Sequence, residues 1–293
     1  MSRRSILKVV PHGTQIIEKL KNDEDYYGEY GQQFLSNSNI YNLLKFPKLF
    51  RVPQPKSKAM LEGSYFHTAM LEPEKLKDYQ IIDVASRSTK AYKEACPEGE
   101  ILLLQKEKEH LDKLIDTMKD NLEMYDEIYA EGNEFEVPAV DTIMGNEWKG
   151  KADIITEDYV IDIKTTNDMS KFMYSCKTYN YDSQAYLYQR FFNKPLRFFV
   201  IDKQSFQLGI YDCSANFVEG GKNIINFLAM IKVMTLITIF IKKFYNFFKL
   251  ENTTQKNRLW VDVPNTCNSR REKDFILFDT LEKLELTIKI TKE

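Results

Sequence analysis

The sequence has few cysteines, and their spacing excludes several kinds of site. Four cysteines, Cys96, Cys176, Cys213 and Cys267, are spread over 293 residues, and none belongs to a C-x-x-C pair. Zinc and iron–sulfur sites usually draw their ligands from closely spaced cysteines. We therefore expect no zinc site and no iron–sulfur cluster, and we interpret the cysteines as the free thiols of a cytosolic protein.

The sequence also lacks an excess of basic charge. Its formal net charge is −2 and its isoelectric point is about 6.1. Proteins that bind nucleic acid over a broad surface are usually basic, so the composition disfavours such a surface but is compatible with a local basic channel. The amino-terminal segment 2–8 is basic and has no long apolar core of the kind found in secretory signals, which favours a cytoplasmic location.

Acidic residues are absent from the segment 224–248, which is dense in Ile, Phe and Met. A membrane-spanning helix needs about 20 predominantly apolar residues. Lys232 and Lys242 interrupt the apolar run. We therefore expect a buried or oligomer-forming helix here, and no membrane span.

What is present indicates a globular chain, with 43% hydrophobic and 29% charged residues. The length suits one large domain or two small ones. Segment 1–33 is polar and tyrosine-rich without a clear period, and 251–293 is weakly patterned. Periodicity and turn residues predict helices over 39–45 (with Ser38 as N-cap), 59–71, 104–130, 168–174 and 182–192, and strands over 135–140, 152–155, 160–164, 196–202 and 207–211.

Helices before and after a cluster of strands indicate the α/β class, with a mixed central β-sheet flanked by helices. In the long helix predicted over 104–130, five apolar residues recur at helical spacing and are expected to face the core. They are Leu111, Leu114, Ile115, Met118 and Leu122.

The stretch 150–166, GKADIITEDYVIDIKTT, places charged residues among apolar ones. In its second strand Ile161 and Ile163 point to one face, and Asp162 and Lys164 to the other. An unpaired charge among apolar neighbours is costly, so these residues need a physical reason. A salt bridge across a half-exposed sheet edge is one reading of the pattern, and a catalytic site is the other.

The connection between the two strands sets the register. If Glu157 and Asp158 form a two-residue loop, Thr156 pairs with Tyr159, and Asp153 then lies opposite Asp162. The two carboxylates would be about 5 Å apart and would repel each other, and Lys164 can compensate only one of them. A divalent cation such as Mg²⁺ or Mn²⁺ prefers such oxygen ligands, so the register predicts a metal site.

Two further pairs share helix faces. Gly63 and His67 are at positions i and i+4, and the absence of a side chain at Gly63 lets another backbone approach beside the imidazole. Gln184 and Tyr188 have the same spacing. Each pair taken alone is compatible with ordinary packing.

Taken together, the motifs form an ordered set: G-x-x-x-H at 63–67, G-x-x-D at 150–153, apolar-D-x-K at 161–164 and Q-x-x-x-Y at 184–188. This set resembles the RecB-like branch of the PD-(D/E)XK nucleases, and within it the RecE-type exonuclease (exodeoxyribonuclease VIII) domain of phages and prophages. Segments 36–47, 71–74 and 163–166 add to the likeness, which covers residues 34–220. It implies a restriction-endonuclease-like core and a division into a polar segment 1–33, an exonuclease domain 34–222 and a carboxyl-terminal apolar helix and tail 223–293.

The resemblance also implies roles for single residues. His67, Asp153, Asp162 and the backbone carbonyl of Ile163 would bind Mg²⁺ or Mn²⁺. Lys164 would orient or deprotonate the attacking water and stabilise charge on the phosphate. Gln184 would hold Lys164 or the scissile strand, and Tyr188 would support that helix. Asp162 stands where the family more often has glutamate.

The activity implied is a metal-dependent DNA exonuclease that digests linear duplex in the 5′-to-3′ direction, in recombination or replication of a phage-like element. Its setting would be the cytoplasm of a bacterium or of a phage-infected host, with a single-strand annealing protein as a partner and a ring-like homo-oligomer as the assembly. A RecB-like nuclease acting on single strands or flaps is one alternative. A catalytically silent DNA-end-binding or assembly protein is another.

The amino terminus of the helix predicted over 39–45 offers free N–H groups to an anion. Ser36 and Ser38 are therefore candidates to bind the 5′ phosphate of DNA, although Ser38 as a simple N-cap explains the same pattern. We further expect removal of the Asp162 carboxylate to relieve repulsion with Asp153 and to leave the metal-free protein at least as stable.

Overall fold

The computed structural model describes residues 12–96 and 100–252. The chain divides into two compact units. Unit 1 comprises Met1–Asn37 and Pro53–Gly221, and unit 2 comprises Ser38–Val52 and Lys222–Glu293. The predicted site residues, apart from Ser38, belong to unit 1.

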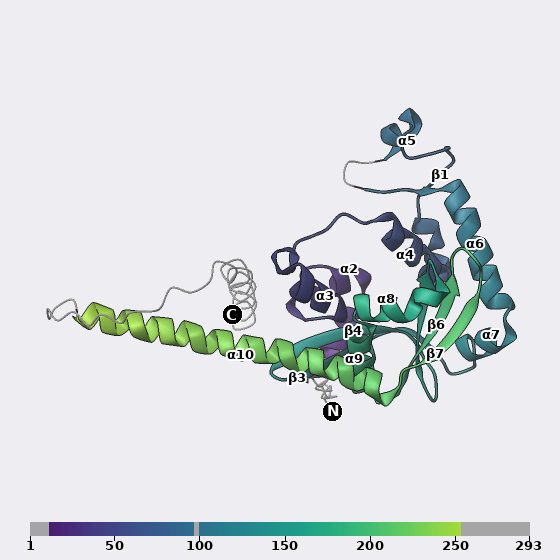
Figure 1. The fold of residues 1–293 in the computed structure, drawn as a ribbon. Helices are drawn as coiled ribbons and strands as arrows, with labels where there is room; N and C mark the ends of the chain where they lie inside the picture. Colours follow the sequence, from purple (N-terminus) through teal and green to yellow (C-terminus); the bar gives the residue numbers. More distant parts are fainter. Residues whose placement is uncertain (1–11, 97–99, 253–293) are drawn as a thin grey trace, which may run out of the picture. The chain divides into compact units, whose positions relative to one another are not determined.

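Unit 1 is built on a five-stranded sheet in the order β3-β4-β5-β6-β7 (Figure 1). The strands are β3 (Glu134–Ile143), β4 (Asn146–Ile155), β5 (Val160–Thr166), β6 (Leu196–Asp202) and β7 (Leu208–Asp212). β5 and β6 run parallel, and the other neighbours run antiparallel. The mixed sheet confirms the predicted fold class. β3 and β4 extend further than predicted, because the turn at Met144 and Gly145 joins them into a long hairpin.

One face of the sheet carries the main hydrophobic core. The helices α4 (Lys58–Leu71), α6 (Gln105–Asp120) and α7 (Leu122–Ile128) pack on this face. Strand side chains meet helix side chains here because residues two apart in a strand point the same way. The strands contribute Ile154, Ile161, Ile163, Phe199 and Ile201.

The opposite face carries α8 (Phe172–Thr178) and α9 (Tyr181–Phe192), which form the crossover between the parallel strands β5 and β6. A parallel connection requires such a crossover segment. The ring of Phe172 lies 6.1 Å from that of Phe198, and the ring of Tyr181 lies 5.5 Å from the same residue. Asp162 and Lys164, which alternate with the core isoleucines of β5, therefore face the α9 side.

The helix predicted over 104–130 is two helices, because Asn121 ends α6 and caps α7 by accepting a hydrogen bond from the Met124 amide. Leu111, Leu114, Ile115 and Met118 are buried as predicted. The prediction was wrong for Leu122, whose side chain is 77% exposed. The break at Asn121 changes the phase of the helical repeat, so Leu122 no longer continues the apolar face of α6.

The amino-terminal region contains more structure than its composition suggests. The helices α1 (His12–Leu20) and α2 (Asp23–Tyr27) and the 3₁₀ turn η1 (Gly31–Gln33) precede α3 (Asn37–Lys45). α3 begins at Asn37, so Ser38 lies within its first turn and Ser36 precedes it. The prediction of Ser38 as the N-cap was wrong by two residues, which is a common error at helix ends.

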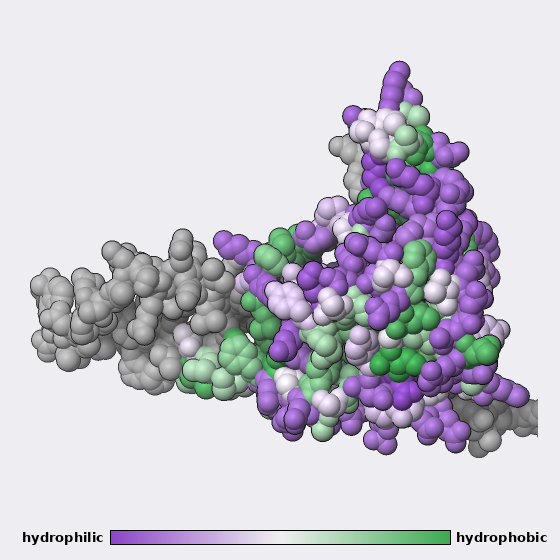
Figure 2. Space-filling view, turned by 45° about the vertical axis from the view of Figure 1, so that its right-hand side comes forward, coloured by the Kyte–Doolittle hydropathy of each residue, from purple (hydrophilic) through white to green (hydrophobic). Residues whose placement is uncertain are grey.

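The small elements of unit 1 lie outside the central sheet. β1 (Ile81–Ile82) and β2 (Leu103–Leu104) pair in parallel, and α5 (Lys90–Ala95) lies between them in the sequence. The 3₁₀ turns η3 (Pro73–Asp78) and η4 (Met169–Lys171) follow α4 and β5. The face of the molecule in Figure 2 is mostly hydrophilic, and its apolar patches are small and separated from one another.

Unit 2 contains most of α3, the 3₁₀ turn η2 (Pro47–Leu49) and most of the long helix α10 (Ala215–Asn252). An 18-residue window within Ala215–Phe240 has a mean hydropathy of 1.8, and the stretch is long and apolar enough to cross a membrane by length and composition alone. The lysines within the apolar run therefore argue less strongly against a membrane span than the sequence analysis assumed. A single helix of this kind is still weak evidence for a membrane protein, since a core helix of a soluble protein has the same properties. The tail 253–293 lies outside the described residues.

Candidate active site

The β4–β5 hairpin sets the geometry of the candidate site. The Thr156 amide donates to the Tyr159 carbonyl at 2.9 Å, and Ile154 pairs with Ile161, which confirms the predicted register. The main-chain ladder ends at this pair. Beyond it, the Ile163 amide donates to Asp153 Oδ2 at 2.8 Å. The Asp153 side chain therefore takes the place of a ladder acceptor.

His67 and Asp153 come together from different elements. His67 of α4 places Nδ1 3.2 Å from Asp153 Oδ2. The acidic residue Glu136 of β3 completes a group with them, because one potential ligand atom from each of the three lies within 4.8 Å of the others. Sequence reasoning did not single out Glu136.

Glu136 has an unusual backbone for a glutamate. Its neighbours Phe135 and Val137 pair with Ile154 and Ala152, so Glu136 lies across from Asp153, and its φ angle is +50°. A glutamate in the left-handed region costs of order 1 kcal/mol, so the surrounding ladder must hold it there. The pattern apolar-Glu-apolar before the hairpin was the available signal, but an alternating strand with one acidic residue is too common to identify a site.

Asp162 and Lys164 form a second cluster with Gln184 of α9. Lys164 Nζ lies 2.5 Å from Asp162 Oδ2, and Gln184 Nε2 donates to Asp162 Oδ1 at 2.5 Å. Asp162 is thus compensated within the chain. This changes the expected effect of Asp162→Ala on stability: the truncation would leave Lys164 and Gln184 without their partner, at a cost of about 3–5 kcal/mol for a broken buried pair.

Tyr188 and Gly150 explain how α9 is held on β4. The Tyr188 hydroxyl donates to the Lys151 carbonyl at 2.7 Å. A Cβ at Gly150 would lie 2.6 Å from the Phe191 ring and 2.9 Å from the Tyr188 ring. Glycine in the G-x-x-D motif therefore allows the close packing that brings Gln184 to Asp162. Ser36 and Ser38 lie at the start of α3, and their role in phosphate binding stays a prediction.

The carboxyl groups of the two clusters differ in their ionisation. Burial raises the pKa of Asp162 to about 6, against the opposing effect of Lys164. Burial and the Asp153 charge raise the pKa of Glu136 to about 7. For Asp153, the effect of burial is outweighed by His67, Lys164 and the Ile163 amide, which lower its pKa. Burial opposes protonation of His67, yet Asp153 raises its pKa, and Asp162 raises that of Lys164.

This donor set fits a divalent cation. His67, Glu136 and Asp153 offer an imidazole nitrogen and carboxylate oxygens within reach of one ion. Burial first and the Asp153 charge second raise the pKa of Glu136, while Lys151, 3.8 Å away, acts in the opposite direction. Asp162 Oδ2, although paired with Lys164, is buried and has no hydrogen bond among the described residues. The role of Asp162 as a further metal ligand stays a prediction.

No curated protein matches the sequence. Among solved structures, the crystal structure of a "Putative exonuclease" from Eubacterium rectale is similar, with a TM-score of 0.52 and 16% identity, covering 83% of this chain and 96% of that one. The structure of SSO0001 has a TM-score of 0.31 and 15% identity, covering 73% of this chain and 85% of that one. The family model for the PDDEXK-like domain of unknown function DUF3799 matches residues 48–223. With that match over more than half of its length, the chain belongs to the DUF3799 family of PDDEXK-like, nuclease-fold domains.

Proposed function

We propose that the protein is a divalent-metal-dependent exodeoxyribonuclease that hydrolyses linear duplex DNA from the 5′ end. The observation that carries the proposal is that His67 pairs with Asp153 and Lys164 with Asp162, while His67 and Lys164 line one cavity. The PDDEXK-like family and the exonuclease description of the similar E. rectale protein favour a nuclease. Polarity, duplex preference and a role in phage-type recombination rest on the resemblance of the motifs to RecE-type domains.

The residues divide the chemistry between them. His67, Glu136 and Asp153 would hold a Mg²⁺ or Mn²⁺ ion, and Asp162 and the Ile163 carbonyl would be further ligands. Such an ion polarises a phosphate and lowers the pKa of bound water. Lys164, whose pKa is raised, is a cation at neutral pH. It therefore suits stabilisation of the phosphate charge better than removal of a proton from water.

Gln184 and Tyr188 have supporting roles in this proposal. Gln184 fixes the carboxylate of Asp162, which in turn fixes Lys164. Tyr188 anchors α9 to β4 through the Lys151 carbonyl. Their replacement should weaken activity less than replacement of Asp153 or Lys164, because neither contacts the reacting phosphate directly.

The decisive experiment supplies the protein with end-labelled linear duplex, nicked duplex and single-stranded DNA, with Mg²⁺, with Mn²⁺ or with chelator. The proposal expects metal-dependent release of mononucleotides from linear duplex, starting at the 5′ end. Cleavage of single strands or flaps alone would favour the RecB-like alternative. Binding of DNA ends without cleavage in either metal, and without metal binding in calorimetry, would favour the catalytically silent alternative.

The 5′-phosphate hypothesis needs its own comparison. If Ser36 and Ser38 bind that phosphate, 5′-phosphorylated duplex should be degraded faster than 5′-hydroxyl duplex, and Ser36→Ala should remove the difference. Equal rates with both substrates would eliminate this pocket. Asn37→Ala is not a suitable control, because its side chain accepts a hydrogen bond from Ser183.

Assembly into a homo-oligomer, possible partnership with an annealing protein and a cytoplasmic setting are further parts of the proposal. Large apolar side chains on α10 are exposed in the described chain, and burial in a subunit contact would remove them from water. They include Phe227, Met230, Met234, Ile237 and Phe240. Light scattering after size-exclusion chromatography tests this: a monomer of 34.5 kDa that degrades DNA processively would contradict a ring.

A further inference from the structure

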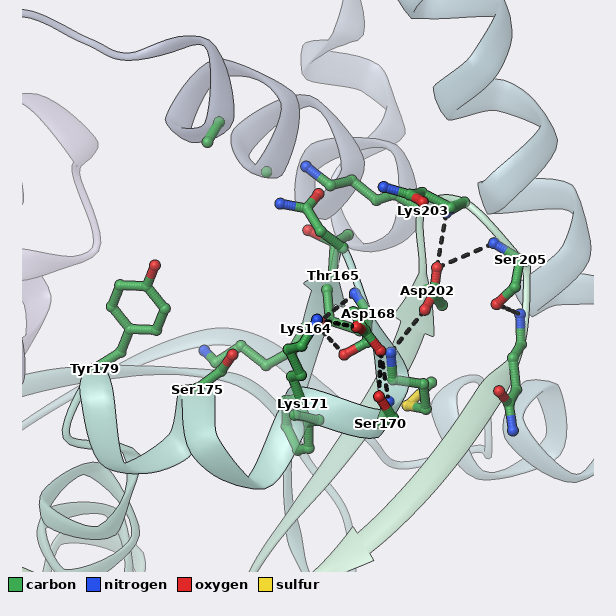
Figure 3. A pocket seen from close by; sticks show the side chains of 18 of the residues that line it. Lys164, Thr165, Asp168, Ser170, Lys171, Ser175, Tyr179, Asp202, Lys203 and Ser205 are labelled. Carbon is green, nitrogen blue, oxygen red and sulfur yellow. Dashed lines mark hydrogen bonds and ion pairs between the residues drawn. The ribbon is translucent and has the colours of Figure 1, made fainter.

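A cavity of about 900 Å³ opens beside the candidate active site (Figure 3). His67 and Lys164 lie in its lining, so the cavity reaches the residues proposed to act on the scissile phosphate. Its other lining residues come from α4, from the end of β5, from the segment that runs through η4 and α8 to the start of α9, and from the end of β6 and the turn that follows it. All of these belong to unit 1.

The wall of the cavity formed by α4 has few side-chain atoms, because two of its three lining residues are alanine and glycine. Ala59, Gly63 and His67 line it at successive i, i+4 positions on one helix face. A Cβ at Gly63 would meet nothing within 4 Å. Packing therefore does not require glycine here, although glycine inside a helix is less stable than alanine. What the glycine preserves is open space next to His67.

The η4 and α8 side is rich in hydrogen-bonding groups. Figure 3 shows Lys171, Ser175 and Tyr179 following one another along this segment, with Lys203 on the opposite side of the cavity. Hydroxyl and ammonium groups of this kind are the usual contacts of nucleic-acid phosphates and sugars. The Tyr179 ring, 52% exposed, lies 6.1 Å from that of Tyr181 and offers a surface on which a base can stack.

The acidic residues of the cavity do not oppose an anion strongly. Asp202 accepts hydrogen bonds from the amides of Met169, Gln204 and Ser205. These backbone N–H groups partly offset the negative charge of its carboxylate. Asp168 pairs with Lys171 at 2.6 Å on the surface. Water and salt screen an exposed pair of this kind, so it contributes little and a phosphate can compete for the lysine.

We propose that this cavity holds a single, unpaired nucleic-acid strand beside the scissile phosphate, and that Gly63 sets the width of the passage. The strand backbone passes between the α4 face that carries Ala59 and Gly63 and the polar side formed by η4 and α8. One base stacks on the ring of Tyr179. A cavity of this size resembles sites that enclose small ligands, so it suits a short stretch of one strand and not a duplex. The inference rests on the proposed nuclease function and adds Gly63 and Tyr179 as the residues that shape the strand passage.

The test compares Gly63→Ala and Gly63→Leu with Gly13→Leu as a matched control. Gly13 lies in helix α1, and a Cβ there would also meet nothing within 4 Å. Binding of a fluorescent single-stranded oligonucleotide is measured by anisotropy in chelator, so that cleavage plays no part. The melting temperature of each variant is measured in parallel.

Both Gly63 variants should melt a few degrees above the wild type, because Ala and Leu favour helix. Gly63→Ala should change the Kd by less than about threefold, and Gly63→Leu should weaken binding at least tenfold. The control should bind as the wild type does. Wild-type affinity in the stable Gly63→Leu variant would overturn the channel, as would binding of duplex but not of single strands.

Failure of the nuclease proposal would look different. The wild type would bind the single strand and Gly63→Leu would not, yet no DNA would be cleaved with either metal. That result would leave the strand channel standing and remove the catalytic role. A second readout strengthens the case: 2-aminopurine near the strand end should lose fluorescence on binding through stacking on Tyr179, and Tyr179→Ala should abolish this quenching while Tyr179→Phe retains it.

Discussion

The two halves of the candidate site are built from similar residues but balance their charge differently. In the first half, Asp153 lies against the imidazole of His67, and Glu136 lies 3.8 Å from the ammonium group of Lys151. In the second, Asp162 has its own cation, Lys164, and a donor in Gln184. The first half therefore presents two carboxyl groups that an added cation could bind, whereas the second carries a lysine that can face a phosphate. This difference predicts that the halves fail in different ways when altered.

The largest effect is expected for Asp153→Asn. The change removes the charge that is central to the first half but keeps the shape of the side chain. Cleavage should fall by roughly 10³-fold or more, since a bound ion supplies several kcal/mol of stabilisation to the transition state. Calorimetry with Mn²⁺ should show the binding signal lost as well. Retained metal binding would place the ion elsewhere.

Lys164→Ala should separate the two halves. Loss of this cation should lower kcat by about 10²- to 10³-fold, as for other groups that stabilise transition-state charge. Metal binding at the first half should persist, because Lys164 offers no ligand. Urea unfolding is the control for the fold, since the Asp162 carboxyl loses its ionic partner. If Lys164→Ala abolishes metal binding and activity together, the two halves act as one unit and do not have the separate roles proposed for them.

Glu136→Gln is expected to be milder. An amide keeps one oxygen ligand and removes the charge, so metal affinity should fall by about 10- to 100-fold, with activity recovered at high metal concentration. The metal-free variant should be more stable than the wild type at pH 7.5, because a buried carboxylate with a raised pKa is removed. An unchanged metal affinity would exclude Glu136 from the ligands.

The stability of the metal-free protein should depend on pH. The pKa values of Asp162 and Glu136 in the folded protein, about 6 and about 7, are above those of the unfolded chain. The folded state therefore binds more protons between pH 4.5 and 7, and stability falls as pH rises through this window. Chemical denaturation in chelator should show a loss on the order of 2 kcal/mol between pH 5 and 7.5. Added Mg²⁺ should restore stability at pH 7.5, and a flat profile would contradict the assignment.

Lys171→Ala should have the smallest effect. A single exposed phosphate contact should raise the Kd for single strands about threefold at moderate salt and should reduce the slope of log K against log salt by about 0.7. Lys177→Ala, on the neighbouring helix α8 but outside the cavity lining, is the matched control. Equal slopes for both variants would remove Lys171 from the channel.

The sequence predicted the elements that depend on local signals. The alternation of Ile161, Asp162, Ile163 and Lys164 gave both the strand and its two faces, and the hairpin register followed from loop length. Ordered motifs also identified His67 and Gln184, which the fold brings to the hairpin from α4 and α9. The strand and its register were confirmed because they rest on a period and on a loop length that folding preserves, and the roles of His67 and Gln184 stay predictions.

The remaining features depend on tertiary contacts. Glu136 joins His67 and Asp153 only because β3 pairs with β4, and nothing local distinguishes it from other strand glutamates. The compensation of Asp162 by Lys164 within the same strand, which reverses the expected effect of Asp162→Ala, depends on burial against α9. The amino-terminal helices α1 and α2 have few apolar positions, and tertiary packing of residues such as Leu20 and Tyr26 stabilises them.

The left-handed backbone of Glu136 has a consequence for how this protein evolves. Glycine or asparagine would occupy that conformation more easily than glutamate, so backbone stability favours replacement of Glu136. A requirement for the carboxylate would oppose that replacement. Lineages of this family that keep glutamate here should therefore be under selection for activity, and lineages that have become silent should accumulate glycine or asparagine at this position before their core residues change.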